Sequence, residues 1–174
     1  MLQIGSLNID DYRASERTFQ ILTQVEGRAG RGERKGEVVV QTYNPDNFSI
    51  ECAKNQDYDA FYESEIILRK TLKYPPFSDI IMFNITSTDE GDIEKSASYV
   101  YNVLLKNAGD KILIYKPMPA PINKIKNKYR WRIIAKCRFN NSVIDIINKS
   151  LEIYYKNRRL KSTITVDVNP TNMA

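Results

Sequence analysis

The chain has 174 residues, of which 42% are hydrophobic and 27% charged, a composition typical of a folded globular protein. It contains no histidine, which excludes Ser-His-Asp and Cys-His catalysis and metal binding by histidine. Its two cysteines, Cys52 and Cys137, match no zinc-site spacing, so we expect no metal site. They fit buried thiols of a reduced, cytoplasmic protein, and no segment is typical of a signal peptide or a membrane span.

The net charge of +5 is distributed unevenly along the chain. Residues 1–77 carry ten basic and twelve acidic side chains, whereas residues 78–174 carry sixteen basic and nine acidic ones. The segment 116–138 contains eight basic residues and no acidic one. This asymmetry favours a polyanionic partner for the second half, and a solubilising basic face is the alternative interpretation.

The first half predicts short elements separated by strong breaks. Its expected elements are helices over Ser15–Val25, Phe48–Asn55 and Tyr58–Leu72 and a strand over Glu37–Tyr43. Four glycines between Gly27 and Gly36 are expected to end the first helix. The sequence Tyr74-Pro75-Pro76-Phe77 ends the last one, because proline cannot continue a helix.

The second half has a regular order of strands and helices. We expect strands over Asp79–Thr86, Lys111–Tyr115, Tyr129–Arg138 and Ser162–Val168, and helices over Asp92–Asn107 and Asn141–Tyr155. The first strand places Ile81, Phe83 and Ile85 on one face, and the first helix carries an apolar stripe at helical spacing: Ile93, Ala97, Val100, Leu104 and Ala108. Pro117, Pro119 and Pro121 are expected to exclude regular structure from the loop between the second and third strands. The resulting order β-α-β-β-α-β predicts an α+β domain of the ferredoxin-like type, with both helices on one face of the sheet.

Apolar and basic residues alternate along the strand predicted at Tyr129–Arg138. The apolar residues, among them Trp131, are expected to pack on the helices. The basic residues of the strand and of the segment before it are expected to face solvent and bind phosphates: Arg130, Arg132, Lys136, Arg138, Lys124, Lys126 and Lys128.

A second candidate site is the segment Gln24–Arg31, which fits the pattern Q-x-x-G-R-x-G-R. Arg28 and Arg31 can place two guanidinium groups on phosphate oxygens, and Gly27 and Gly30 allow close approach of the backbone. Gln24 can bind a ribose, a phosphate or a water molecule. The segment therefore suits arginine-finger chemistry, in which positive charge stabilises a transferring phosphoryl group, and a plain solvated turn is the alternative.

This pattern resembles motif six of superfamily-two helicases, and further segments narrow the resemblance. They are Asp11–Arg17, Gly36–Val38, Gln41–Pro45, Tyr58–Tyr62, Tyr74–Phe77, Pro117–Pro121, Tyr129–Trp131 and Asp167–Pro170. In this order they resemble the C-terminal part of the PriA family of bacterial replication-restart helicases. The resemblance extends over nearly the whole chain.

The resemblance implies an ATP-dependent 3′-to-5′ DNA helicase that recognises stalled replication forks and starts primosome assembly. The implied partners are forked or single-stranded DNA, the single-stranded-DNA-binding protein and primosomal proteins. ATP and Mg would bind to the full-length protein, and the family's zinc would bind to a part absent from this chain. The implied division is a tail of a RecA-like lobe over residues 1–56, a connecting helix and linker over 57–77 and the ferredoxin-like domain over 78–174.

Several departures from the family pattern bear on function. The chain has no G-x-x-x-x-G-K-[ST] loop and no D-E-x-H motif, so we expect it to be inactive as an ATPase by itself. Glu26, Lys116 and Asn169 replace residues usual in the family. We expect residues 1–55 to be ordered by packing on Tyr58–Leu72 or on another chain.

Two alternative functions use the same basic residues. The second half is either a protein-interaction module, which binds primosomal partners or the acidic tail of the single-stranded-DNA-binding protein, or a separate RNA-binding domain of ribosomal type. The RNA-binding interpretation leaves residues 11–77 without a purpose.

Overall fold

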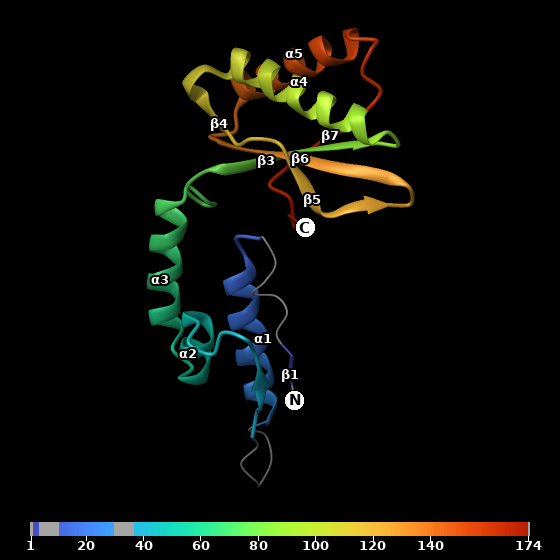
Figure 1. Cartoon of the computed structure of the whole chain (residues 1–174). Helices are drawn as coiled ribbons and strands as arrows, with labels where there is room; N and C mark the ends of the chain where they lie inside the picture. Colours follow the sequence, from blue (N-terminus) through green and yellow to red (C-terminus); the bar gives the residue numbers. More distant parts are fainter. Residues whose placement is uncertain (1, 4–10, 30–36, 174) are drawn as a thin grey trace. The chain divides into compact units, whose positions relative to one another are not determined.

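The computed structural model describes residues 2–3, 11–29 and 37–173. It divides the chain into two compact units, Met1–Leu72 and Lys73–Ala174, whose helices and strands are drawn in Figure 1. Among the described residues, no helix combines the length and the apolar character needed to cross a bilayer.

The first unit is built on stacked aromatic rings. Its elements are α1 (Ala14–Ala29), α2 (Phe48–Lys54), α3 (Tyr58–Thr71) and two short parallel strands, β1 (Leu2–Gln3) and β2 (Val40–Gln41). Phe61 of α3 lies 4.3 Å from Phe19 of α1 and 5.6 Å from Phe48 of α2, measured between ring centroids. The expected packing of residues 1–55 on the helix at residues 58–72 is therefore present.

A buried ion-pair network also links α1 to α3. The Arg69 guanidinium donates hydrogen bonds to Glu16 of α1 at 2.9 Å and to Glu65 of its own helix at 2.8 Å. Because Glu65 is buried, the hydrogen bond from Arg69 compensates part of its lost hydration. Arg69 thus connects α3 to α1.

Helix α1 is longer than the expected Ser15–Val25, since it continues to Ala29, inside the glycine-rich segment that was expected to end it. One glycine inside a helix costs only about 1 kcal/mol relative to alanine, and the burial of Phe19 and Leu22 on earlier turns of α1 offsets that cost. The strand expected at residues 37–43 is reduced to the two residues of β2, since only these pair with β1 in the part of the chain that is described.

The second unit is an antiparallel sheet with two helices on one face (Figure 1). Its elements are β3 (Asp79–Ser87), α4 (Glu90–Ala108), β4 (Ile112–Ile114), β5 (Met118–Ile125), β6 (Lys128–Cys137), α5 (Asn141–Lys156) and β7 (Thr163–Val168). The strand order is β4-β6-β3-β7, and β5 pairs with β6. Each helix therefore connects two parallel strands that are separated by a third, as in split β-α-β units. The predicted α+β class and order of elements are confirmed, with β5 added.

The core lies between the helices and the face of the sheet that they cover. Ile81, Phe83 and Ile85 of β3 are fully buried, and Ala135, Ile133 and Trp131 of β6 lie opposite them in register. The stripe predicted on the helix after β3 is buried as expected: Ile93, Ala97, Val100, Leu104 and Ala108. Trp131 packs against this core and is half-buried, as predicted.

The irregular loop expected at Pro117–Pro121 is wrong, because β5 begins at Met118. Proline lacks a backbone donor and is tolerated on an edge strand or at a bulge. Among the described strands, β5 pairs with β6 alone, and its register shifts between Pro119 and Lys124. The prolines therefore lie where the missing donors leave no ladder hydrogen bond broken.

Asp79, the first residue of β3, joins three segments of the chain. Its carboxylate accepts hydrogen bonds from the Asn169 side chain and from the Phe139 backbone N–H, each at 2.9 Å. Asn169 has a φ of 52°, which asparagine tolerates better than most residues, and its backbone N–H donates to Ile80 O at 2.7 Å. The hydrogen bonds from Asn169 and Phe139 lower the pKa of Asp79.

We expect Asp79→Asn to lower the free energy of unfolding by about 1–2 kcal/mol at pH 7. Because folding lowers the pKa of Asp79, its contribution is present at neutral pH. It is lost as the pH falls below about 4, the ordinary pKa of an aspartate, and through the folded pKa. Urea denaturation at pH 7 and pH 3 measures the effect, with the exposed Glu152→Gln as control. A difference as large at pH 3 as at pH 7 contradicts the role of the carboxylate.

Candidate nucleic-acid interface

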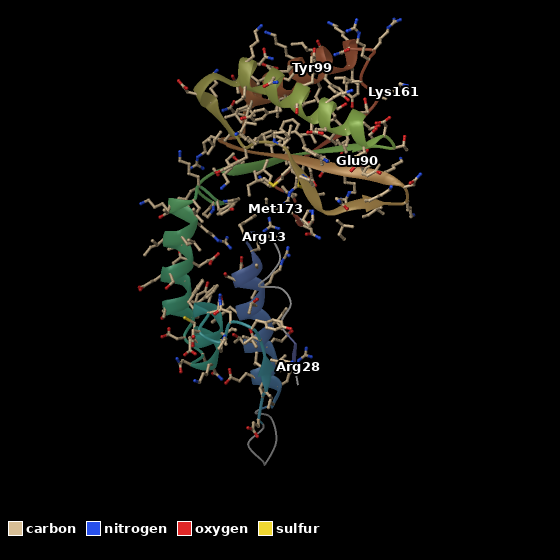
Figure 2. The ribbon with its side chains drawn as sticks, in the orientation of Figure 1. Arg13, Arg28, Glu90, Tyr99, Lys161 and Met173 are labelled. Atoms are coloured by element: carbon tan, nitrogen blue, oxygen red, sulfur yellow. The ribbon has the colours of Figure 1, made fainter. Side chains whose placement is uncertain are left out.

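The first candidate site lies on the last turns of α1. Gln24 and Arg28 are four residues apart, so they share one face of the helix, and both are exposed. Among the described residues, Arg28 has no hydrogen-bond or ion-pair partner, and Figure 2 shows it at the end of α1. A Cβ added at Gly27 would meet no atom within 4 Å. Gly30 and Arg31, the other predicted residues of this motif, lie outside the described residues.

A cavity of about 270 Å³ lies beside this turn, between α1, β2 and α2. Its lining is mainly apolar, with Glu26 and Lys54 as the charged members: Leu22, Glu26, Val38, Val40, Ile50, Ala53 and Lys54. Glu26 therefore lines this cavity, two residues before Arg28, and an apolar lining of this kind suits side chains better than phosphates.

The second candidate site was expected on the face of β6 that points away from the helices. The register places Arg132 opposite Asn84 and Lys136 opposite Ile80, on the face opposite to the core. However, Arg132 is only 3% exposed and Lys136 only 6% exposed. The prediction that these two cations face solvent is therefore wrong, since other parts of the same unit cover this face.

Lys136 is covered by aromatic rings. Its ammonium nitrogen lies 3.5 Å from the centroid of the Tyr74 ring and 5.3 Å from that of Tyr115. Burial lowers the pKa of Lys136. The ring faces compensate part of the lost hydration by cation–π attraction. Two residues further along the chain, the exposed Arg138 donates a hydrogen bond to the Pro76 carbonyl oxygen at 3.3 Å.

Arg132 is covered by the C-terminal segment. Its guanidinium donates a hydrogen bond to the Met173 carbonyl oxygen and lies 3.9 Å from the Met118 sulfur. Met173 itself is buried, and Figure 2 shows it on the side of the sheet opposite to α4 and α5. Arg132 and Lys136 thus hold covering segments in place, and they are removed from the set of exposed phosphate ligands.

Four of the five remaining predicted cations, all except Arg138, lie on the hairpin that β5 and β6 form. We call residues 122–130 the basic arm. Its tip is the two-residue turn Lys126-Asn127, with φ values of 48° and 62° as in a type I′ turn. Lys124, Lys126 and Lys128 are exposed, and Arg130 is half-buried. The ammonium of Lys124 lies 4.3 Å above the Tyr129 ring.

A further basic cluster lies in and beside the connection from α5 to β7. It consists of Lys156, Arg158, Arg159 and Lys161, all exposed, and Lys161 is labelled in Figure 2. Thr163, which follows it, pairs with Thr86, and Thr86 pairs with Arg130. The cluster is therefore at the same end of the sheet as the basic arm.

Sequence reasoning missed the residues that cover the sheet. Tyr74, Tyr115 and Met173 were not identified as partners of the β6 cations, because Tyr74 and Met173 are remote from the strand in sequence and no periodic pattern indicates these contacts. Within the described ranges, no three His, Cys, Asp or Glu side chains are grouped so that they could hold a metal ion.

Comparison with known proteins gives one family. The family model described as "Primosomal protein N C-terminal domain" matches residues 70–171. "Replication restart protein PriA" of Bacillus subtilis is 35% identical over 169 residues, which are 97% of this chain and 21% of that protein. The proteins of the same name from Synechocystis and Rickettsia felis are 39% and 42% identical, over 75% and 79% of this chain and 16% and 21% of their own lengths. The chain thus spans about a fifth of the length of these curated relatives.

A double-mutant cycle tests the contact between Lys136 and Tyr74. We expect Lys136→Met and Tyr74→Leu to couple by about 1 kcal/mol in the free energy of unfolding, because the cation–π contact is largely desolvated. Urea denaturation of the four chains measures the coupling. The cycle of Lys128→Met with Tyr74→Leu is the control, since Lys128 is exposed on the arm. Equal coupling in both cycles contradicts a specific contact.

Proposed function

The chain belongs to the PriA family, as its sequence motifs indicated, and we propose that it serves as the C-terminal region of a replication-restart helicase. In the intact protein this region takes part in ATP-dependent 3′-to-5′ unwinding of DNA at stalled forks, where primosome assembly begins. Its own share of that work is to bind DNA and to contribute arginines to ATP hydrolysis.

The exposed basic arm is the observation that carries the DNA-binding part of the proposal. Residues 111–144 contain no acidic side chain, so no carboxylate of this segment competes for the lysines of the arm. Lys124, Lys126 and Lys128 are exposed and Arg130 is half-buried, which makes four cations available for phosphate oxygens. A two-stranded ribbon is also narrow enough to enter the major groove of DNA.

The end of α1 supports the contribution to ATP hydrolysis. Arg28 is exposed, and the open space at Gly27 leaves room for phosphate oxygens. When bound to the intact protein, ATP with Mg²⁺ supplies the phosphoryl group that is hydrolysed. Arg28, together with Arg31, stabilises the negative charge on that group, and Gln24 on the same helix face positions a water molecule or a ribose hydroxyl. The chain lacks a phosphate-binding loop, so by itself it does not hydrolyse ATP.

The same arm favours a second candidate function, which is binding of an acidic protein tail such as that of the single-stranded-DNA-binding protein. Ile122 and Ile125 are exposed beside the lysines, and an acidic tail with apolar residues would contact both kinds of side chain. An acidic tail peptide that binds the chain but does not bind after Lys124→Glu supports this function. Binding unaffected by that change contradicts it.

The DNA-binding proposal predicts a strong salt dependence. With about four phosphate contacts, log affinity should fall with log salt at a slope of about −3 to −4. We expect Lys126→Gln together with Lys128→Gln to reduce the magnitude of the slope by about 2. Anisotropy titrations of labelled single-stranded, duplex and forked DNA across a salt series measure it.

The control for these titrations removes the same charge elsewhere. Lys106 near the end of α4 and Lys149 in the middle of α5 are both exposed, beside the connection from α4 to β4. Lys106→Gln together with Lys149→Gln should leave the slope unchanged. An equal loss from both double variants contradicts a site on the arm, and no binding by the wild type at low salt contradicts DNA binding itself.

The arginine assignment is tested in the intact protein. Arg28→Ala should lower DNA-stimulated ATP turnover by about 10³-fold or more, because an arginine finger contributes that much to phosphoryl transfer. Affinity for DNA should stay nearly unchanged, since Arg28 is outside the arm. Steady-state ATPase assays with saturating forked DNA measure the turnover, with Arg13→Ala as the control. Unchanged turnover of the Arg28 variant rules out the assignment.

A further inference from the structure

The tip of the basic arm extends beyond the sheet. The pairing of β3 with β6 ends at Ser87 and Tyr129, whereas β5 and β6 remain paired as far as Ile125 and Lys128. The residues from 125 to 128 thus form a two-stranded projection without a third strand, and Figure 1 shows the hairpin reaching past the end of β3. The two-residue turn keeps this projection narrow and fixes its shape.

The arm exposes two isoleucines among its lysines. Ile122 is 58% exposed and Ile125 is 41% exposed, and neither belongs to the core of the unit. Ile122 lies in the bulge between Pro119 and Lys124, whereas Ile125 directly precedes the turn. Ile125 is therefore an apolar group at the leading end of a positively charged projection.

The register gives the two faces of the arm different characters. Ile125 pairs with Lys128, and Arg130 follows Lys128 on the same face because side chains alternate along a strand. Lys124 pairs with Tyr129 on the opposite face. One face thus offers an apolar contact beside two cations, and the other face adds a third cation. Such a surface can contact a base with the isoleucine while the cations hold neighbouring phosphates.

We propose that the arm is a wedge for the end of a duplex, in which Ile125 contacts the outer face of the base pair at a junction of single- and double-stranded DNA. This inference rests on the proposed DNA-binding function and specifies the DNA structure that the arm recognises. Apolar side chains that enter DNA do so at a base step, and opening a stacked interior step requires more free energy than one isoleucine that is already partly covered returns. At a junction, the last base pair already has an uncovered face.

The arm fits DNA better than an added peptide strand. A peptide that pairs along the edge of β5 needs the backbone donors of that strand, and two of them are missing directly before the arm, at Pro119 and Pro121. The lysines lie on both faces of the arm and at its tip, which suits two phosphate backbones that diverge around it. The exposed charge and the missing donors both favour the nucleic acid.

A fluorescent base at the junction tests the wedge with the full chain. The probe is a forked DNA with 2-aminopurine in the last base pair, and a blunt duplex and a single strand of equal length are compared with it. The wild type should lower the 2-aminopurine fluorescence, because Ile125 covers the exposed face of the last base pair and limits its fraying, and it should prefer the fork. Ile125→Gln should abolish the decrease and weaken fork binding by about 5-fold, while its affinity for the single strand and its salt slope stay unchanged.

The matched control is Ile144→Gln, which changes an exposed isoleucine on the first turn of α5. It should behave as the wild type does. A fluorescence decrease retained by Ile125→Gln overturns the wedge while DNA binding stands. Equal affinity of the wild type for fork, duplex and single strand also overturns it. If the wild type binds none of the three DNAs at low salt, both the wedge and the proposed DNA-binding function are wrong.

Discussion

The second unit depends on the burial of two cations on one strand. Arg132 and Lys136 lie in the middle and at the end of β6, on the face that the helices do not cover, and both are almost fully enclosed. A buried cation is tolerated only where other groups replace its hydration. The replacements are the carbonyl oxygen of Met173 for the guanidinium and the faces of Tyr74 and Tyr115 for the ammonium. These contacts fix two segments to the sheet, the linker after α3 and the C-terminal tail.

The same strand therefore has two functions along its length. Near Cys137, the cations of the strand hold the covering segments. Two hydrogen bonds add to these contacts, one from Arg138 to the Pro76 carbonyl oxygen and one from the Asn169 side chain to the Asp79 carboxylate. Toward Lys128 the strand leaves the sheet and its cations are exposed. The strand changes from buried at Arg132 to half-buried at Arg130, where the β5 bulge begins. The bulge separates an anchored part of the hairpin from a projecting part.

Periodicity predicted the covered face of the sheet well, because apolar side chains at every second position of a strand share one face, and that face is stable only when it is buried. Ile81, Phe83 and Ile85 and the stripe on α4 were all placed correctly. The opposite face could not be predicted in this way. A basic residue at every second position of a strand predicts a solvent-exposed face, unless residues that are distant in sequence cover that face. Tyr74 and Met173 are such residues, since they lie about 60 and 40 residues away in sequence from the cations they cover. The prolines of β5 led to the wrong prediction of an irregular loop for a related reason. Whether a proline excludes a strand depends on whether that strand is at the edge of the sheet, which the local sequence does not show. At the other candidate site, α1 includes Gly27 because the packing of its earlier turns outweighs the cost of one glycine.

The distinction between anchoring and exposed cations decides how charge changes on β6 are interpreted. Reversing Arg132 or Lys136 would place a carboxylate against a carbonyl oxygen or a ring face that now contacts a cation. Such a change would disrupt the covered face of the sheet, and in a binding assay that disruption would imitate the removal of a phosphate contact. Changes at Lys124, Lys126 and Lys128 avoid this ambiguity, because their charged groups lie in solvent in the folded chain. Only an exposed cation can be neutralised to measure a phosphate contact, so the arm is the part of β6 and β5 where a change in affinity reports on binding rather than on folding.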